Sequence, residues 1–230
     1  MMLGARTAAW ANSGGGVPTA RDYVQDTLVA MWDADENAGW LKHDVSATTW
    51  LDLIYGNNLP CSFGSVSDQW IRYSSSYQIT IPEPIITGYD FTIQGVFDRT
   101  ETTGNFIAIG FGYSTARLCT GSTTTFGCRF SSAYETIAVS GSRNSVTWLR
   151  SASDGTKIRL FVDGVDKGIF SSSQNNDLTA SSKLCINGEN PYGNYRNIFS
   201  VANIRIYNRA LTADEIAENY AIDKARFGLT

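Results

Sequence analysis

The 230-residue sequence is poor in the side chains from which catalytic and metal centres are most often built. It has one histidine, His43, so a histidine-rich metal site cannot form, and any Ser-His-Asp triad would need this residue. None of the four cysteines stands in the Cys-x-x-Cys spacing of a structural zinc site. His43 lies in a polar stretch, which predicts a surface loop and no catalytic role.

Charge and long apolar runs are also scarce. Lysine and arginine total 18 against 22 aspartates and glutamates, for a net charge of −4. No basic stripe is therefore available to neutralise phosphates, and we expect no nucleic-acid partner. No apolar run approaches the roughly 18 residues of a membrane helix, so we expect no membrane span. With 43% hydrophobic residues, the chain can bury a core, which a disordered chain could not.

Short apolar-alternating segments separated by turn residues run through the chain and predict β-strands. Asp163-Gly164, between Val162 and Val165, predicts a two-residue hairpin turn, because glycine adopts positive φ at little cost. In the segment 91–97, alternation places Phe91, Ile93 and Phe97 inward, with Thr92 and Gln94 outward. Other predicted strands lie at 27–33, 106–111, 145–149, 183–186 and 201–207.

One segment is convincingly helical. Thr212 followed by Glu215 forms the pattern of a capping box, and Leu211 with Ile216 forms a hydrophobic staple. We expect this helix to run to about Lys224. Many short strands and one terminal helix predict an all-β fold, a two-sheet antiparallel jelly-roll sandwich with a short C-terminal helix. Trp32, Trp50 and Trp148 are expected in its core.

The cysteines are expected to stay reduced and partly buried, as small apolar side chains. They are Cys61, Cys119, Cys128 and Cys185. A Cys119–Cys128 disulfide is the alternative if these two residues lie on paired strands.

The N-terminal region is predicted to be separate from the sandwich. Arg6 and the polar residues after it interrupt the apolar stretch that a secretory signal needs, so no signal peptide is expected. The three glycines 14–16 predict a flexible joint. We therefore divide the chain into an attachment arm, residues 1–26, and a folded domain, residues 27–230. Arg6 and Trp10 are the candidate attachment residues, and a frayed end is the alternative.

Five segments resemble motifs of one family. They are LVAMWD at 28–33, the turn motif at 50–58, FTIQGVF at 91–97, LFVDG at 160–164 and IRIYNRALTADEI at 204–216. Together they resemble the concanavalin A-like, laminin-G-like jelly-roll domains over roughly residues 27–222. The closing strand and helix at 204–216 is the most specific of the five. The resemblance implies the same sandwich fold.

Such domains occur in secreted glycan-binding proteins, in polysaccharidases and in phage structural proteins. Without a signal peptide, the resemblance implies a non-enzymatic phage virion protein: a head fibre, a capsid decoration or a tail component. It would be assembled in the bacterial cytoplasm and lie on the virion surface, attached to virion proteins by its arm, in several copies, with the domain free to bind glycans. A bacterial surface or extracellular carbohydrate-binding domain is the alternative, and a polysaccharide hydrolase is a third interpretation.

The related glucanases carry an E-x-D-x-x-E strand, which sets two catalytic carboxylates at the separation that hydrolysis requires. That pattern does not occur in this sequence. The acidic residues have structural explanations instead, as turn residues, helix caps or solvated side chains. A carboxylate pair assembled from distant loops is left open.

Two segments combine aromatic rings with polar side chains, as sugar-binding sites do. In the first, residues 187–197, the candidate glycan-binding residues are Glu189, Asn190, Tyr192, Asn194, Tyr195 and Arg196. The alternative for this segment is a hydrated loop built of turn-forming residues. The second segment, residues 68–73, offers Trp70 and Tyr73, and the alternative there is a strand with Trp70 in the core.

No cofactor is required by this interpretation. The resemblance allows a calcium ion, which family members hold with loop carboxylates and carbonyl oxygens. Asp33, Asp35 and Asp52 are the acids nearest the matching motifs. No D-x-D-x-D-G loop supports them.

Overall fold

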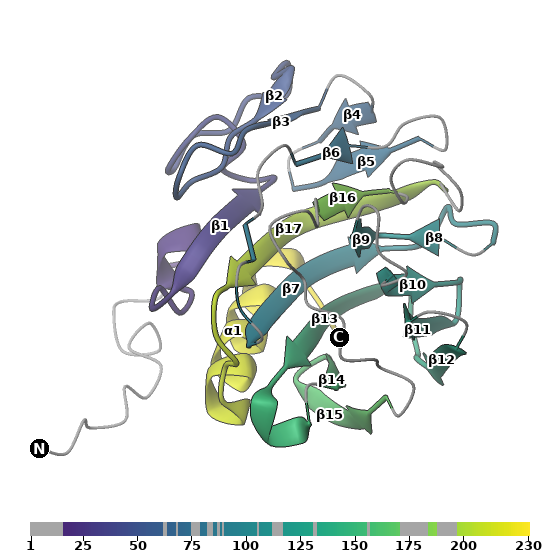
Figure 1. The fold of residues 1–230 in the computed structure, drawn as a ribbon. Helices are drawn as coiled ribbons and strands as arrows, with labels where there is room; N and C mark the ends of the chain where they lie inside the picture. The colour runs from purple at the N-terminus through teal and green to yellow at the C-terminus, as the bar shows by residue number, and fades with distance from the viewer. Residues whose placement is uncertain are drawn as a thin grey trace, which may run out of the picture.

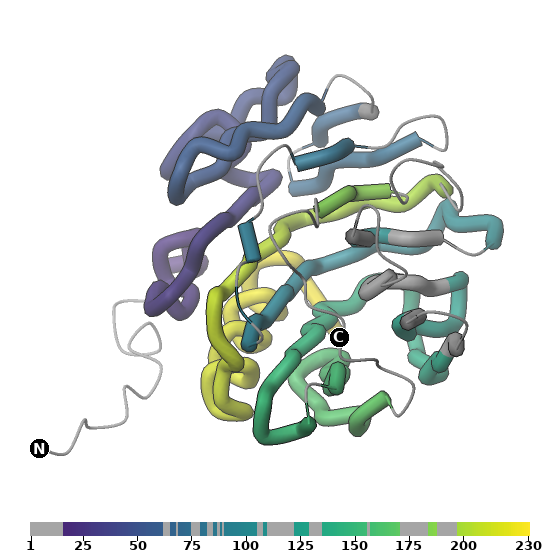
Figure 2. The backbone as a smooth tube through the Cα atoms, in the orientation of Figure 1, coloured from purple at the N-terminus to yellow at the C-terminus, as the bar shows by residue number. Residues whose placement is uncertain are grey.

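The computed structural model of the chain describes most of residues 16–230 (Figure 2). The described residues are 16–61, 64–67, 69–74, 79–81, 85–86, 88, 90–104, 106–111, 117–130, 133–155, 157–170, 184–187 and 197–230. The predicted attachment residues Arg6 and Trp10 lie outside this set. The six candidate glycan-binding residues of segment 187–197 also lie outside it: Glu189, Asn190, Tyr192, Asn194, Tyr195 and Arg196.

A large antiparallel sheet organises the molecule (Figure 1). Its strands run in the order β15 (Val165–Ile169), β14 (Ile158–Val162), β13 (Arg143–Arg150), β7 (Phe91–Asp98), β17 (Phe199–Tyr207), β5 (Ile71–Tyr73) and β4 (Gly64–Val66). An eighth strand, β1 (Leu28–Asp33), also pairs with β17. β17 is long enough to pair with both, since β5 meets its first residues and β1 its last.

Shorter strands form the opposite layer. They are β12 (Ala133–Ala138), β11 (Thr125–Phe130), β10 (Arg117–Gly121) and β8 (Phe106–Ile107) in one sheet, and β6 (Ile79–Thr80), β16 (Leu184–Ile186) and β9 (Ile109–Phe111) in another. A two-stranded ribbon of β2 (Thr49–Trp50) and β3 (Leu59–Pro60) stands at one end. The fold is thus the predicted all-β antiparallel sandwich, with its second layer divided among small sheets.

The main core lies between the two layers. Trp32, Trp50 and Trp148 are all buried there, as predicted. The ring of Phe97 on β7 lies 6.0 Å from that of Trp148 and 6.1 Å from that of Phe126 on β11, centroid to centroid. Aromatic rings at these separations contribute packing beyond their buried area. The inward alternation of β7 predicted from the sequence is confirmed.

Helix α1 (Ala213–Phe227) lies against the other face of the large sheet, which we call the outer face (Figure 1). The predicted capping box is present: Thr212 Oγ1 accepts from the Glu215 amide, and the Glu215 carboxylate accepts from the Thr212 amide. The staple residues Leu211 and Ile216 are both buried. The helix runs one turn past the predicted end at Lys224 and stops at Gly228, where φ is +63°.

The predicted hairpin joins β14 to β15, with Val162 opposite Val165. Asp163 and Gly164 both have positive φ, +52° and +73°. A side chain at Gly164 would also meet the Tyr220 ring of α1, because a Cβ built there lies 2.8 Å from it. The turn is therefore fixed by its own backbone and by contact with the helix.

Two expectations need correction. Cys128 is a buried free thiol, so the alternative Cys119–Cys128 disulfide does not form, although their strands β10 and β11 are paired.

Residues 19–26, which the sequence assigns to the arm, pack against the domain: a short 3-10 helix, η2 (Ala20–Asp22), forms there, and Ala20 and Tyr23 are buried. The folded unit therefore includes residues from Thr19 onward. Within the described residues, no helix has the length and apolar character to cross a membrane.

Candidate functional site

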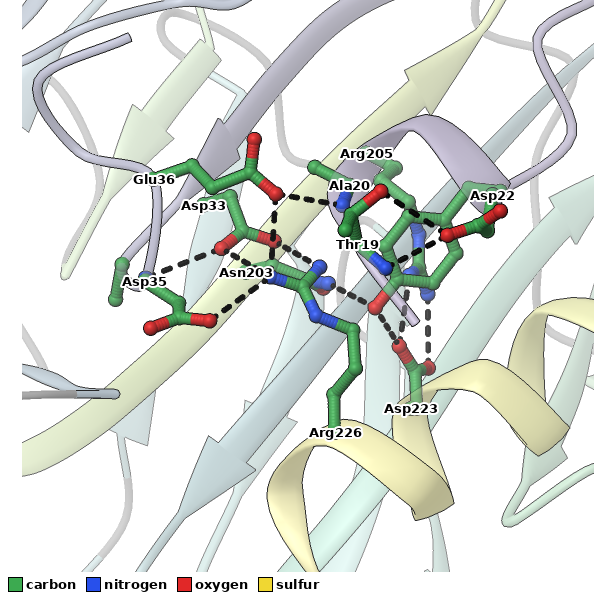
Figure 3. A network of polar contacts seen from close by, with 12 residues as sticks. Thr19, Ala20, Asp22, Asp33, Asp35, Glu36, Asn203, Arg205, Asp223 and Arg226 are labelled. Carbon is green, nitrogen blue, oxygen red and sulfur yellow. Dashed lines mark hydrogen bonds and ion pairs between the residues drawn. The ribbon is translucent and has the colours of Figure 1, made fainter. Parts of the chain in front are cut away.

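The outer face of the large sheet carries the most concentrated polar chemistry among the described residues, and α1 covers part of it. Arg205 on β17 and Asp223 on α1 form a two-point ion pair, with Nη1–Oδ1 at 2.7 Å and Nη2–Oδ2 at 2.8 Å. Both side chains are 0% exposed. Ser145 on β13 donates a further hydrogen bond of 2.6 Å to Asp223 Oδ2. Figure 3 shows Arg205 and Asp223 meeting where the helix lies against the sheet.

A second buried ion pair joins the end of α1 to β1 (Figure 3). Arg226 donates to Asp33 from both terminal nitrogens, at 2.7 and 3.0 Å. Glu36 lies 3.6 Å and Asp35 3.5 Å from the same guanidinium. Burial is the largest effect on Asp33 and raises its pKa although Arg226 lowers it, and the charges of Glu36 and Asp35 raise it further.

The N-terminal segment completes this buried network. The Tyr23 hydroxyl donates to Asp223 Oδ1 at 2.8 Å and accepts from the Asn203 side chain at 2.9 Å. The Arg205 guanidinium lies 3.8 Å from the centre of the Tyr23 ring, and the Ala20 amide donates to Glu36 at 2.7 Å. Burial, with the charge of Asp223, raises the pKa of Tyr23 well above its ordinary value, so the phenol stays a donor. These groups hold the fold together and face no solvent.

The outer face opens at the far end of α1 into a shallow hollow of about 430 Å³. Asp35, Ser67, Gln69 and Trp70 line it, and we call it the Trp70 hollow. A tight turn positions two of these residues, because the Ser67 amide donates to the Trp70 carbonyl at 2.9 Å. Gln69 Nε2 donates to the Arg226 carbonyl at 2.9 Å, which ties the turn to the last turn of the helix.

The Trp70 hollow has the composition of a site for polar, ring-shaped ligands. The Trp70 ring is partly exposed and packs on Phe227, with centroids 6.1 Å apart. The Asp35 side chain is 44% exposed. An aromatic ring can stack on the C–H face of a sugar, while the carboxylate, amide and hydroxyl beside it accept or donate hydrogen bonds to sugar hydroxyls.

Among the described residues that line the hollow, Asp35 is the one carboxylate. Glycoside hydrolysis uses two carboxyl groups about 5–10 Å apart on either side of the bond. Asp33 and Glu36, close to Asp35 in the sequence, are buried: Asp33 pairs with Arg226, and Glu36 accepts from the Ala20 amide.

The two aromatic candidates of segment 68–73 have different places. Trp70 lines the hollow, and its role in glycan binding stays a prediction. Tyr73 points into the sandwich core, is 1% exposed and packs on Phe199 with centroids 5.7 Å apart, so its ring cannot stack on an external sugar. Side chains alternate along a strand, and in β5 those of Ile71 and Tyr73 point inward, which explains the difference. Ser67 was not among the residues predicted from the sequence, and Asp35 and Trp70 were predicted for different sites.

Two of the three acids suggested for calcium serve other partners, and the third, Asp35, lines the Trp70 hollow. Asp33 pairs with Arg226, and the Asp52 carboxylate accepts from the backbone amides of Met31 and Asn57, at 3.0 Å each. Among the described residues there is no group of three or more His, Cys, Asp or Glu side chains that could hold a metal ion. Calcium binding stays a prediction.

Comparison with solved structures places the fold among domains of carbohydrate-active proteins. The chain is similar to Trypanosoma rangeli sialidase in complex with 2,3-difluoro-KDN, with a TM-score of 0.67 and 16% identity over 92% of this chain. It spans about a third of the sialidase, 34% of that chain. It is also similar to domain 4 of AbnA, a GH43 extracellular arabinanase from Geobacillus stearothermophilus, in complex with arabinotriose. There the TM-score is 0.55 and the identity 14%, over 84% of this chain and 97% of the domain.

Family membership follows from the sequence as well. No curated protein sequence matches the chain. The profile of the concanavalin A-like lectin/glucanases superfamily, Laminin_G_3, matches residues 74–217. That segment includes β7, the hairpin and the start of α1. Because it makes up more than half of the chain, this protein belongs to the concanavalin A-like lectin/glucanases superfamily.

Proposed function

We propose that this protein is a non-catalytic carbohydrate-binding domain that holds a saccharide at the Trp70 hollow. The observation that carries the proposal is the combination in one open hollow of a partly exposed indole with a carboxylate, an amide and a hydroxyl. The similarity to domain 4 of the arabinanase supports it, because that neighbour is of domain size and is bound to arabinotriose.

The absence of catalysis is part of the proposal, and the carboxylates support it. Buried Asp33 and Asp223 are neutralised by arginines. Buried Glu36 and Asp52 accept from backbone amides. A carboxylate held in this way cannot act as a nucleophile or as a proton donor to a bound sugar without breaking the fold around it.

We also propose a setting for the domain, on a phage particle to which residues 1–18 attach it. Two features support this setting. The domain resembles those of phage structural proteins, and Trp10, which precedes the glycines, offers an apolar side chain for attachment. A bacterial surface carbohydrate-binding domain is the second candidate setting. Deletion of residues 1–16 distinguishes them: it should abolish incorporation into particles and leave saccharide binding unchanged if the first is right.

The test of binding uses a panel of neutral and acidic polysaccharides, with affinity measured by calorimetry on the best ligand. Trp70→Ala should weaken binding by at least about tenfold, or 1.4 kcal/mol, because the stacking surface is lost. Tyr55→Ala is the matched control, since Tyr55 is an exposed aromatic residue, 73% exposed, that does not line the hollow.

Trp70 also packs on the helix, so a second variant guards against a folding defect. Asp35→Asn keeps the shape of an exposed side chain and should weaken binding, with an unfolding free energy in urea close to that of the wild type. Equal affinity of Trp70→Ala, Asp35→Asn and the wild type would remove the hollow from the account. Release of reducing ends from any bound polysaccharide would overturn the absence of catalysis.

A further inference from the structure

We propose that the ligand is a chain of neutral sugars that leaves the Trp70 hollow and runs across the strands of the outer face. This inference rests on the proposed function and specifies its substrate class. The surface that would hold the chain is a line of five cross-strand neighbours, which we call the polar row. Its members are Ser65 on β4, Arg72 on β5, Ser200 on β17, Asp98 on β7 and Arg143 on β13.

The register of the sheet aligns this row. Ser65 lies opposite Arg72, and Arg72 lies opposite Ser200. Asp98 lies opposite both Ser200 and Arg143. Because neighbouring strands lie about 4.8 Å apart, a line across five strands is roughly 19 Å long. A surface of that length accommodates a chain of sugars and is too long for one.

All five side chains point away from the sandwich core. Their neighbours along the strands, such as Ile71 on β5 and Phe97 on β7, point into the core, and side chains alternate along a strand. The row is therefore on the same face as α1. The helix ends at Phe227, beside Trp70, and the chain beyond it packs Leu229 against Val96 and Ala202, next to the row. The Arg143 side chain is 52% exposed and that of Arg72 38%.

The row is continuous with the hollow. The Arg143 guanidinium carbon lies 5.2 Å from the centre of the Trp70 ring. Trp70 immediately precedes β5, and Arg72 follows it by two residues. Arg143 lies over the Trp70 ring, so the neighbour of a sugar bound at Trp70 would meet this arginine.

The charges of this surface favour a neutral ligand. Arg143 Nε donates to Asp98 at 2.7 Å, and Arg72 Nε donates to Glu101 at 2.6 Å. Each arginine is thereby matched with a carboxylate, and Asp35 adds a further negative charge in the hollow. An acidic polysaccharide would meet three carboxylates and no excess of positive charge. A neutral one can place its hydroxyls between the donors and acceptors of each pair.

The Arg72–Glu101 ion pair can yield to a ligand at little cost. Its side chains are 38% and 55% exposed, and ion pairs between exposed side chains contribute little to stability in water, whereas Asp98 in the Arg143 pair is 13% exposed. Hydroxyls of a sugar chain can therefore take over some of their hydrogen bonds, and the planar fork of arginine suits paired oxygens.

Calorimetric titrations with a sugar, its trimer and its hexamer test the proposal, using arabinan, xylan and cellulose fragments and polygalacturonate fragments as the acidic series. In the wild type, we expect the hexamer of one neutral series to bind at least about tenfold more tightly than the single sugar. Arg72→Met and Arg143→Met should each reduce this gain about five- to tenfold, the loss of one hydrogen bond to a charged group. Arg159→Met is the matched control, because Arg159 is also an ion-paired arginine and lies on β14, outside the row.

The outcomes separate the two proposals. If Trp70→Ala loses binding while both row variants bind the hexamer as the wild type does, the polar row is wrong and the hollow stands. Equal affinity for the single sugar and the hexamer, or binding of the acidic series alone, would also overturn the row. If the wild type binds none of the series, the proposed function fails with it. Unfolding in urea, unchanged in the row variants, shows that each measured loss belongs to the surface.

Discussion

The outer face of the large sheet has two regions, each with an arginine–aspartate ion pair. The two pairs differ in how far they are exposed to solvent. Beneath α1, Arg205 and Asp223 are 0% exposed. Beyond the end of the helix, Arg143 and Asp98 form a pair of the same 2.7 Å length, with the arginine 52% and the aspartate 13% exposed. The chemistry of the two pairs is alike, so the cover provided by the helix decides their roles. The covered pair fixes the helix to the sheet, and the open pair is available to a ligand.

The energies of the two regions should differ accordingly. Removing one partner of a buried ion pair leaves a charge without solvent or counter-charge and costs about 3–5 kcal/mol. Removing one partner of an exposed pair costs about 0–1 kcal/mol, because water replaces the lost partner. The predictions below test this difference, in order of decreasing effect.

The largest loss is expected for Asp223→Asn. The amide is nearly the same shape but leaves Arg205 charged and buried, so the free energy of unfolding should fall by about 3–5 kcal/mol in urea denaturation. Saccharide affinity of the folded fraction should not change, since Asp223 does not line the hollow. A loss below about 1 kcal/mol would mean that the covered pair is no more important than an exposed one.

Tyr23→Phe should cost less, about 1–3 kcal/mol. It removes one hydroxyl and leaves the buried Asn203 amide without the acceptor it has at 2.9 Å. Tyr55→Phe is the control, because its exposed hydroxyl should change stability by less than about 0.5 kcal/mol. Equal unfolding free energies of the two variants would mean that Tyr23 does not hold residues 19–26 to the domain. These residues would then belong to the attachment arm.

The first turn of α1 should give the covered region a pH dependence. The hydrogen bonds from Arg209, together with the Thr212 amide, lower the pKa of Glu215 from 4.5 to about 2. The folded state therefore favours the charged form, and this stability is present above pH 4.5 and lost as the pH falls toward 2. The side chain is partly exposed, so we expect about 1 kcal/mol.

Glu215→Gln should lack this part of the pH dependence. The comparison is the difference in unfolding free energy between wild type and variant, measured by urea denaturation from pH 7 to pH 2. The difference should be nearly constant above pH 4.5 and shrink below it. A difference that does not change with pH would show that the carboxylate is not held in its charged form.

The smallest effect is expected in the open region. Glu101→Gln removes the partner of Arg72, but the Glu101 side chain is 55% exposed, so the unfolding free energy should change by less than about 1 kcal/mol. Thermal unfolding of Glu101→Gln and of Asp223→Asn under the same conditions compares the two losses of stability directly. A loss as large as that of the buried variant would show that the polar row has a structural role.

Local patterns in the sequence were enough for the fold and for its helix. The capping box at Thr212 and the hairpin at Asp163-Gly164 depend on residues adjacent in the chain, and both were predicted. Gln94 was predicted to point outward, and it does point away from the sandwich core. It is nevertheless buried, because Asn219 of α1 donates to it at 2.6 Å. No pattern near Gln94 in the sequence indicates that a helix residue 125 positions further on covers it.

The candidate site was less accessible to sequence analysis for the same reason. Trp70 was named for its ring, but Asp35 was named only as a calcium ligand, since the two are far apart in the chain. Their proximity arises because β17 pairs with both β1 and β5, which brings the ends of these strands together. The polar row likewise depends on cross-strand register, which no single segment contains.

The most direct test of the whole account is a two-dimensional NMR titration of the isotope-labelled protein with the oligosaccharide that binds best. The account predicts that shift changes concentrate at the Trp70 indole and at the amides of Arg72, Ser200 and Arg143, with Tyr23 and Asn219 unchanged beneath the helix. Shift changes confined to residues 188–196, or centred on the region that α1 covers, would contradict it.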